Sequence, residues 1–230
     1  MNSFLENSLA ILKNRISEAA ARSGRSPAEI ELVVVSKGQS IENMRELVDG
    51  GTLLFGESRL QEALSKIAML PARVRWHCIG HLQSNKVRKA LPCFELIHSV
   101  DNEELACTID RIASEIGLFP RVLLEVNVSG EGTKYGFSPE VLKLSFEKLL
   151  RLPRLQVEGL MTMAPLSLDP ETARPYFRKL RELRDELAAN SGVPLSTLSM
   201  GMSGDYEVAI EEGATLVRVG SAIFKKNAVL

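Results

Sequence analysis

The chain has 230 residues, of which 45% are hydrophobic and 25% charged, with 16 glycines and 10 prolines. This composition is typical of a folded globular protein and excludes disordered, collagen-like and coiled-coil proteins. Because 28 basic residues are balanced by 29 acidic ones, no overall field attracts nucleic acid or an anionic membrane. We expect a single domain over residues 1–230, with two small domains as the alternative.

The cysteines indicate a reducing compartment, and the positions of the charged residues argue against a signal peptide and a membrane span. Cys78, Cys93 and Cys107 are odd in number and form no Cys-x-x-Cys pair, which argues against a disulfide framework and a zinc site. Charged residues interrupt the first 25 residues, and no other apolar run approaches the roughly 18 residues of a membrane span. We therefore expect a cytoplasmic protein with no signal peptide and no membrane partner.

The chain begins with an expected helix and continues with alternating strands and helices. Apolar residues at helical spacing from Leu5 to Ala20 predict an amphipathic helix within residues 1–26 that stops near Gly24 and Pro27. From Glu31 onward, short apolar runs alternate with amphipathic segments. Eight runs are predicted strands: Leu32–Ser36, Leu53–Phe55, Val74–Ile79, Leu96–Val100, Val122–Val128, Val157–Met163, Leu198–Met200 and Leu216–Val219.

The segments between these strands have recognisable helix ends. Serine, asparagine and aspartate precede helices because their side chains accept hydrogen bonds from free backbone N–H groups, and glycine commonly follows them. The expected ends are Ser40 before and Gly50 after one helix, a capping box of Asp101 and Glu104 with Gly117 at the end of the next, and Ser138 with Pro139 at the start of a third. The apolar stripe from Phe177 to Leu187 indicates a longer helix.

The fold class follows from the strand composition. Strands rich in valine and leucine with little alternation are buried on both faces, as in a parallel sheet covered by helices. Residues 31–221 provide about 24 residues for each of eight strand–helix units, close to the economical end for a (β/α)₈ barrel. We therefore predict an α/β fold, a single (β/α)₈ TIM-type barrel over residues 31–224 with an extra N-terminal helix. An open doubly wound sheet is the alternative.

Lys37 is the first candidate functional residue. It directly follows the first predicted strand, where barrel enzymes place functional groups. An ordinary lysine that extends from a strand end into solvent is the simpler interpretation. However, Lys37 shares its side-chain direction with Val33 and Val35, so its amine can point into the barrel mouth. A partly desolvated amine has a lowered pKa and can form a Schiff base.

Two glycine- and serine-rich turns near the C-terminus indicate an anion site. Leu198–Asp205 reads as a strand, a glycine turn and a helix capped by Ser203, and free N–H groups with a hydroxyl at a helix start bind anions. A routine cap with nothing bound is the alternative. Phosphates in barrels commonly lie at the loops after strands seven and eight, and Gly220 with Ser221 supplies the adjacent loop. Together the two turns suggest one phosphate.

Arg218 lies inside the apolar strand Leu216–Val219. An unpaired guanidinium there would cost several kcal/mol, so it needs a partner. A structural carboxylate such as Glu57 is one possibility. The other is an acceptor on a ligand, and an arginine facing the ring nitrogen is one arrangement that proteins use to tune pyridoxal phosphate.

His77 and His81 flank a predicted strand end, and Cys78 lies between them. The spacing could suggest metal ligands, but no carboxylate is nearby, so we favour a hydrogen-bonded structural or rim role over zinc.

Residues 71–94 carry basic side chains and no acidic one. Such a run is usually a solvated helix face. Contact with RNA or an acidic protein is the alternative, but Trp76 is the one aromatic residue interleaved with the charges, so we expect no nucleic-acid partner. The basic residues are Arg73, Arg75, Lys86, Arg88 and Lys89.

Eight motifs occur in an order that is highly specific in combination: Val34–Lys37, Phe55–Arg59, Trp76–Lys86, His98–Asp101, Val126–Glu131, Gly159–Met163, Leu198–Ser203 and Val217–Ser221. With these motifs the chain, from about Leu32 to Phe224, resembles the pyridoxal phosphate homeostasis protein family, whose fold resembles the N-terminal barrel of alanine racemase.

The resemblance implies pyridoxal 5′-phosphate (PLP) as the cofactor and assigns its contacts. It implies Lys37 as the cofactor lysine and Arg218 as the neighbour of the pyridine nitrogen. The expected cofactor-binding residues are Lys37, Ser58, Met200, Gly201, Ser203, Arg218, Gly220 and Ser221, of which Ser203, Gly220 and Ser221 hold the phosphate.

Three positions depart from the family pattern. Ser58 stands where asparagine is usual, Gly38-Gln39 replaces a pair that contains threonine, and Lys225-Lys226-Asn227 replaces a terminus that contains glycine. The first two bear on the geometry at the face of the cofactor ring, and the third lies beyond the phosphate loop.

Three functions from different classes compete: a PLP carrier, a PLP enzyme such as an amino-acid racemase, and a nucleic-acid binder. Racemisation needs a proton source on each face of the substrate. Racemases of this type place one of them on a second domain or across a dimer, whereas nine residues follow Ser221 here. Arg218 would also keep the pyridine unprotonated, which weakens it as an electron sink. We therefore expect a monomeric homeostasis protein that holds PLP as a Schiff base without turnover. The resemblance alone implies that it also supplies PLP to apo-enzymes.

Overall fold

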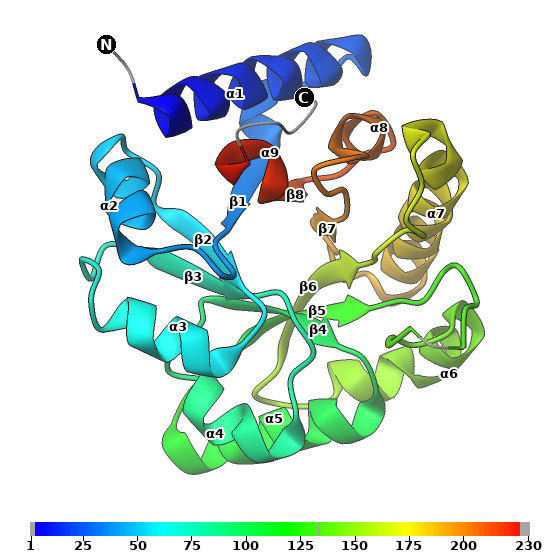
Figure 1. Ribbon diagram of the computed structural model, residues 1–230. Coiled ribbons are helices and arrows are strands. Elements are labelled where there is room, and N and C mark those ends of the chain that lie inside the picture. Colours follow the sequence, from blue (N-terminus) through cyan, green and yellow to red (C-terminus); the bar gives the residue numbers. More distant parts are fainter. Residues whose placement is uncertain (1–2, 133, 226–230) are drawn as a thin grey trace.

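The structure is a computed structural model that describes residues 3–132 and 134–225. Within these residues, eight strands pair in parallel and in chain order to form a closed barrel (Figure 1). The predicted TIM-type barrel is therefore confirmed, and the open-sheet alternative is wrong. The strands are β1 (Glu31–Val35), β2 (Leu54–Glu57), β3 (Arg75–Cys78), β4 (Leu96–Val100), β5 (Arg121–Glu125), β6 (Gln156–Met161), β7 (Thr197–Ser199) and β8 (Leu216–Val219).

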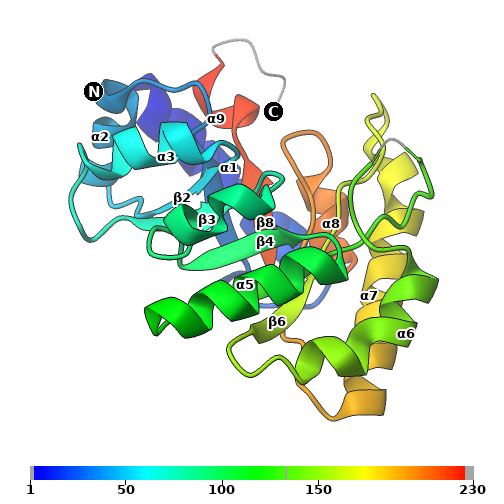
Figure 2. The same cartoon turned by 90° about the horizontal axis from the view of Figure 1, so that it is seen from below.

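Helices surround the strands as a ring, and Figure 2 shows α5 alongside β4 on one side of it. They are α1 (Phe4–Arg22), α2 (Ile41–Asp49), α3 (Leu60–Ile67), α4 (Val87–Ala90), α5 (Glu103–Ile116), α6 (Pro139–Leu150), α7 (Arg174–Ser191), α8 (Tyr206–Glu211) and α9 (Ser221–Phe224), with 3₁₀ turns η1 (Pro27–Glu29), η2 (Ser84–Lys86) and η3 (Pro170–Ala173).

The extra N-terminal helix, α1, lies on the outside of the barrel. It starts with a capping box in which Ser3 and Glu6 satisfy each other's backbone N–H groups. Its predicted apolar stripe from Leu5 to Ala20 is buried and packs against α8, α9 and α2. The helix thereby supports the two short helices that follow β7 and β8. Met1 and Asn2 of the predicted helical segment lie outside the described residues.

The local signals for helix ends were right at several positions and wrong at Asp101. Ser40 and Ser138 cap α2 and α6, and Gly117 ends α5 with φ 74°. The expected capping box of Asp101 is wrong. The side chain of Asn102 accepts the hydrogen bond from the backbone N–H of Leu105 instead, because the carboxylate of Asp101 is engaged with His81 (2.8 Å).

Two regions of apolar side chains hold the barrel together. The larger fills the space between strands and helices, and the smaller fills the barrel interior with Val33, Leu54, Leu96, Leu123, Met161 and Leu216. Gly159 on β6 is required by packing, since a Cβ there would lie 1.8 Å from the carbonyl oxygen of Thr197. Towards the carboxyl ends of the strands the buried residues become polar, which marks that end of the barrel as the place for chemistry.

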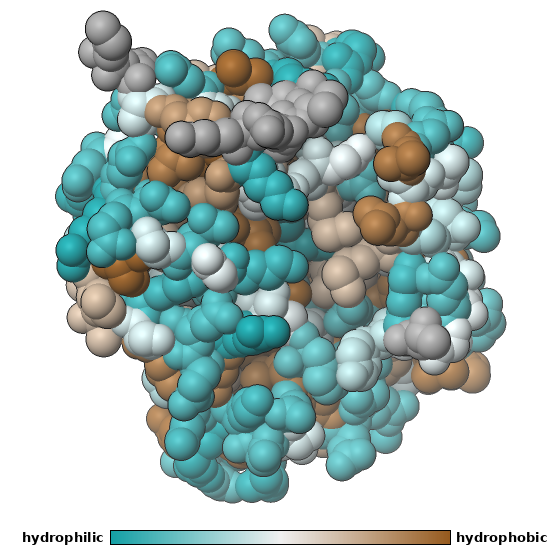
Figure 3. Space-filling view, in the orientation of Figure 1, coloured by the Kyte–Doolittle hydropathy of each residue, from teal (hydrophilic) through white to brown (hydrophobic). Residues whose placement is uncertain are grey.

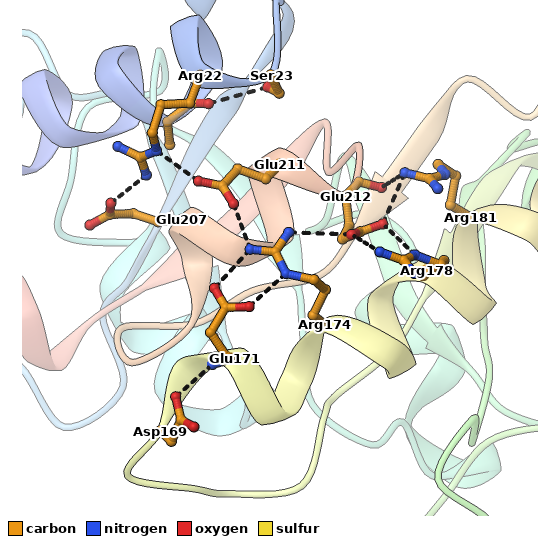
Figure 4. Close-up of polar contacts among 11 residues, drawn as sticks. Arg22, Ser23, Asp169, Glu171, Arg174, Arg178, Arg181, Glu207, Glu211 and Glu212 are labelled. Carbon is orange, nitrogen blue, oxygen red and sulfur yellow. Dashed lines mark hydrogen bonds and ion pairs between the residues drawn. The ribbon is translucent and has the colours of Figure 1, made fainter.

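A cluster of ion pairs ties α1, η3, α7 and α8 together (Figure 4). Arg22 on α1 pairs with Glu207 and Glu211 of α8 at 2.7 Å each, and Arg174 on α7 pairs with Glu211 at 2.6 Å. At the other end of the cluster Glu212, whose side chain is 5% exposed, faces three guanidinium groups: those of Arg174, Arg178 and Arg181.

Replacing Glu212 with glutamine is expected to lower the free energy of unfolding by about 1–3 kcal/mol, because a buried acceptor of charge-assisted hydrogen bonds loses its charge. Urea unfolding followed by circular dichroism measures the change. Glu147→Gln is the matched control: Glu147 pairs with Arg151, but both side chains are 81% exposed, so we expect less than about 0.5 kcal/mol. Equal effects of the two substitutions would contradict a stabilising role for the cluster.

Candidate functional site

A cavity of about 460 Å³ opens at the carboxyl ends of the strands. It is bounded by the loops after β1, β2, β6, β7 and β8, and by the short helix α9. Six of the eight predicted site residues line it together: Lys37, Ser58, Ser203, Arg218, Gly220 and Ser221. Apolar side chains of Val35, Ile79 and Met163 form part of the wall.

The other two predicted residues, Met200 and Gly201, do not line this cavity. Met200 is fully buried, and the carbonyl oxygen of Gly201 accepts a hydrogen bond from the backbone N–H of Arg218 (3.0 Å). Gly201 has φ 91°, and a Cβ there would lie 2.9 Å from the Cα of Tyr206, so the backbone turn requires glycine. The pair therefore supports the cavity wall from behind.

Lys37 lies two residues beyond the end of β1 and its side chain is exposed, rather than partly desolvated as expected. Gly38 follows with φ 70°, and its N–H donates to the carboxylate of Glu62 (3.0 Å). Gln39, the second residue of the Gly38-Gln39 pair that departs from the family pattern, lines the cavity. The unusual Gly38-Gln39 pair thus forms a sharp turn directly after the lysine.

A buried ion pair holds the backbone before Lys37. The ammonium of Lys66 on α3 lies 2.5 Å from the carboxylate of Glu57 and donates to the carbonyl oxygen of Ser36 (2.7 Å). The hydroxyl of Ser36 donates to the same carboxylate at 2.7 Å. Glu57 is therefore the partner of Lys66. The alternative that Glu57 pairs with Arg218 is wrong. Sequence reasoning missed Lys66, although its spacing from Leu60 and Ala63 places it on the same buried face of the helix.

Arg218 lies at the cavity wall, almost completely buried. Its guanidinium donates to the hydroxyl of Ser199 and to the carbonyl oxygen of Thr162 (2.9 Å). Burial lowers the pKa of Arg218 to about 10, while the charges of Glu125 and Asp205 act in the opposite direction. The group therefore remains a cation at neutral pH.

The loops after β7 and β8 meet at Ser203. Its hydroxyl accepts from the backbone N–H groups of Gly220 and Ala222 at 3.3 Å each, at the start of α9. The expected role of Ser203 as the cap of α8 is wrong, because the residue before α8 is Asp205. A Cβ at Gly220 would lie 3.0 Å from the carbonyl oxygen of Val35, so the loop can approach β1 because this residue is glycine.

The histidines fall into two separate groups. His77 and His98 hydrogen-bond to each other inside the barrel (3.0 Å), and His98 also contacts Ser199 (2.9 Å). His81 lies on the rim, where its ring stacks on Tyr135 with 4.0 Å between ring centroids. These are the hydrogen-bonded structural and rim roles that we favoured. Within the described part of the chain, no three histidine, cysteine, aspartate or glutamate side chains are grouped to hold a metal ion.

Residues beyond the predicted set add charge to this end of the barrel. Glu125 at the end of β5 is buried, and burial raises its pKa to about 7, assisted by the charge of Asp101. Lys225 also lines the cavity. Lys226 and Asn227, the other two residues of the C-terminal departure from the family pattern, lie outside the described residues.

Acidic side chains from other elements partly neutralise the basic residues of segment 71–94. Arg75 pairs with Glu31 and Glu95 at 2.7 and 2.6 Å, and Arg88 pairs with Glu115. No helix among residues 3–132 and 134–225 has the length and apolarity needed to cross a membrane.

Comparison with known proteins identifies close relatives over almost the whole chain. Residues 8–228 match the family model described as alanine racemase, N-terminal domain. A pyridoxal phosphate homeostasis protein of Aquifex aeolicus is 48% identical over 94% of this chain and 95% of its own length. One of Pseudomonas aeruginosa is 44% identical over 97% of this chain and 96% of its own length.

Solved structures agree with this fold. PipY of Synechococcus elongatus with PLP bound has a TM-score of 0.81 and 39% identity, and the match covers 91% of this chain and 99% of PipY. Alanine racemase of Clostridium difficile 630 matches with a TM-score of 0.75 at 16% identity, over 96% of this chain and 58% of the racemase. The second match shows a shared fold alone.

Proposed function

Because the chain belongs to the pyridoxal phosphate homeostasis protein family, we propose that it binds PLP covalently on Lys37 without significant turnover and so buffers this reactive aldehyde in the cell. The observation that carries the proposal is the convergence of an amine, a buried guanidinium and two glycine- and serine-containing loops on one cavity. PLP presents an aldehyde, a ring nitrogen and a phosphate, which are the three groups that these residues would recognise.

The cavity fits such a group in size and chemistry. Its volume of about 460 Å³ is within the usual range for cofactor sites, which combine apolar walls with a few polar groups. Among the described residues, Arg218 uses two of its five N–H donors, which leaves donors for an acceptor in the cavity. Gly220 allows the loop after β8 to lie against Val35 at the cavity wall, since a Cβ there would lie 3.0 Å from the carbonyl oxygen of Val35.

Each residue has a proposed role. The hydroxyls of Ser203 and Ser221 and the backbone of Gly220 would bind the phosphate, and Arg218 would donate to the ring nitrogen. Lys37 would hold PLP through a C=N double bond between its amine nitrogen and the aldehyde carbon, with the carbonyl oxygen and the two amine hydrogens released as water. Ser58 would contact the cofactor from the position directly after β2, and Met200 and Gly201 would support the loop that carries Ser203.

The absence of turnover rests on Arg218. A guanidinium that already carries a full set of protons cannot accept one, and it disfavours a second cation on the adjacent ring nitrogen. An unprotonated pyridine withdraws electrons less strongly, and racemisation depends on that withdrawal. Amino-acid racemase activity of the alanine racemase type is the alternative function.

Incubation with amino acids in deuterated water distinguishes the two functions. We expect the PLP-loaded protein to incorporate negligible deuterium at Cα of alanine, serine or lysine, although these amines displace Lys37 slowly. Chiral chromatography and mass spectrometry measure inversion and exchange. Rapid exchange that disappears in Lys37→Ala would establish the racemase alternative and overturn the carrier proposal.

The phosphate contacts give a second test. Ser203→Ala and Ser221→Ala are each expected to weaken PLP binding by about 1–2 kcal/mol, because each removes one hydrogen bond to a charged group while backbone donors remain. Ser167→Ala, which alters a hydroxyl that lines the cavity from the segment after β6, is the control and should change little. Equilibrium dialysis measures affinity. Equal binding of PLP and of pyridoxal, which lacks the phosphate, would contradict a phosphate site.

We further propose a cytoplasmic monomer that passes PLP to apo-enzymes. On the face seen in Figure 3, hydrophilic side chains predominate and the apolar ones form small groups, so the apolar surface seen there is small for a stable interface with a second copy. Light scattering at micromolar concentration tests this state, and a concentration-independent dimer mass would contradict it.

A further inference from the structure

Arg218 heads a row of buried side chains that crosses the barrel interior. Its guanidinium contacts Ser199 on β7, Ser199 contacts His98 on β4, and His98 contacts His77 on β3. All four side chains are almost completely buried, with at most 4% exposure. Buried polar groups rarely remain without partners, so the direction of each hydrogen bond can be worked out from donors and acceptors.

The first link fixes the hydroxyl of Ser199. A guanidinium only donates, so the oxygen of Ser199 accepts from Arg218. The hydroxyl hydrogen then needs an acceptor, and among the described residues the ring nitrogen Nδ1 of His98, 2.9 Å away, provides it. Nδ1 of His98 therefore carries no proton.

The next link follows from the first. A neutral His98 without a proton on Nδ1 has it on Nε2, which donates to Nδ1 of His77 at 3.0 Å. Burial keeps both rings neutral: it lowers the pKa of His98 well below its usual value, and that of His77 to about 4. Every hydrogen bond in the row therefore points away from Arg218.

This polarity has a consequence for the cavity. Ser199 is held as an acceptor, and with the carbonyl oxygen of Thr162 it fixes the guanidinium of Arg218 at two points. Hydrogen bonds in such a chain polarise one another, so an acceptor on His98 strengthens the contact between Ser199 and Arg218. If His98 could not accept, the hydroxyl of Ser199 would lose its partner and the guanidinium would lose a fixed support.

We propose that His98 is a positioning residue that, through Ser199, fixes the guanidinium of Arg218 as a hydrogen-bond donor to the ring nitrogen of the cofactor and thereby sets selectivity for a pyridine ring. The inference rests on the proposed PLP site. It names residues that sequence reasoning did not assign to that site, and it predicts discrimination between a nitrogen and a C–H at one ring position.

The experiment compares PLP with 1-deazapyridoxal 5′-phosphate, in which a C–H replaces the ring nitrogen. Both carry the aldehyde and the phosphate, so their affinity ratio reports the ring contact alone. Affinities of the purified full-length protein are measured by fluorescence titration. We expect the unaltered protein to prefer PLP by about tenfold or more, the value of a hydrogen bond to a charged group.

Two variants of nearly equal shape separate hydrogen bonding from packing. His98→Met offers Ser199 no good acceptor and should reduce the preference to less than about threefold, with the affinity for the deaza compound nearly unchanged. His98→Gln should retain the preference, because its carboxamide oxygen can accept from Ser199 while its N–H₂ donates to His77. Ser199→Ala provides a second route if His98→Met does not fold, and it should also lose the preference.

The outcomes are distinguishable from failure of the proposed function. If the unaltered protein binds PLP and the deaza compound equally, PLP binding stands but the positioning role is overturned. A full preference in His98→Met or in Ser199→Ala also overturns it. If the protein binds neither compound, the proposed function itself fails and the inference fails with it.

Discussion

Replacing Lys37 with alanine is expected to abolish the visible absorption band of the PLP-loaded protein and to leave the fold intact. The band requires the conjugated C=N double bond between the lysine and the cofactor, and alanine offers no amine. The side chain of Lys37 is exposed, and the backbone hydrogen bonds of this loop involve Ser36 and Gly38 instead, so its removal should cost little stability. Absorption spectra and thermal unfolding of both proteins measure the two effects.

Lys225 provides the matched control, because it is a second exposed lysine that lines the same cavity. Lys225→Ala should retain the band at full intensity. Weak non-covalent binding should persist in Lys37→Ala, since Ser203, Arg218 and Ser221 are unchanged. Loss of the band in Lys225→Ala together with its survival in Lys37→Ala would contradict the assignment.

Replacing Lys66 with methionine should lower the free energy of unfolding by about 3–5 kcal/mol, because it leaves the carboxylate of Glu57 buried and uncompensated. Glu57 is fully buried, and the ammonium of Lys66 lies 2.5 Å from it. The carbonyl oxygen of Ser36 loses a donor in the same variant. Urea unfolding at pH 7 measures the change.

The double variant Lys66→Met with Glu57→Leu tests the cause. Apolar residues of similar volume often replace a buried ion pair at little cost, so the double variant should recover most of the stability lost in the single one. A loss below about 1 kcal/mol in Lys66→Met would show that the pair is not a major support of the loop before Lys37. A double variant as unstable as the single one would indicate packing rather than charge.

The sequence predicted those features that depend on neighbouring residues. Strand positions followed from runs of buried valine and leucine, and the ends of α2, α5 and α6 from Ser40, Gly117 and Ser138. Once the strands form a closed parallel barrel, their carboxyl ends must share one rim. Lys37 and Arg218 were therefore predictable neighbours although 181 positions separate them.

Contacts between distant residues were less predictable because they depend on register and side-chain direction. The pairing of Glu57 with Lys66 requires that α3 turn one face onto β2. Ser203 was assigned to α8 from its place before that helix, whereas its hydroxyl serves the loop after β8. Asp101 and Asn102 are equally good caps by propensity, and a contact with His81 decides between them.

Borohydride reduction of the PLP-loaded protein, followed by peptide mapping, identifies the lysine that holds PLP. Reduction converts the bond between the cofactor and its lysine into a stable secondary amine, so mass spectrometry can locate it. We expect one labelled peptide, with the label on Lys37. A label on another lysine, such as Lys134 or Lys225, or no label in a protein that retains PLP, would contradict the assignment of this cavity as the PLP site.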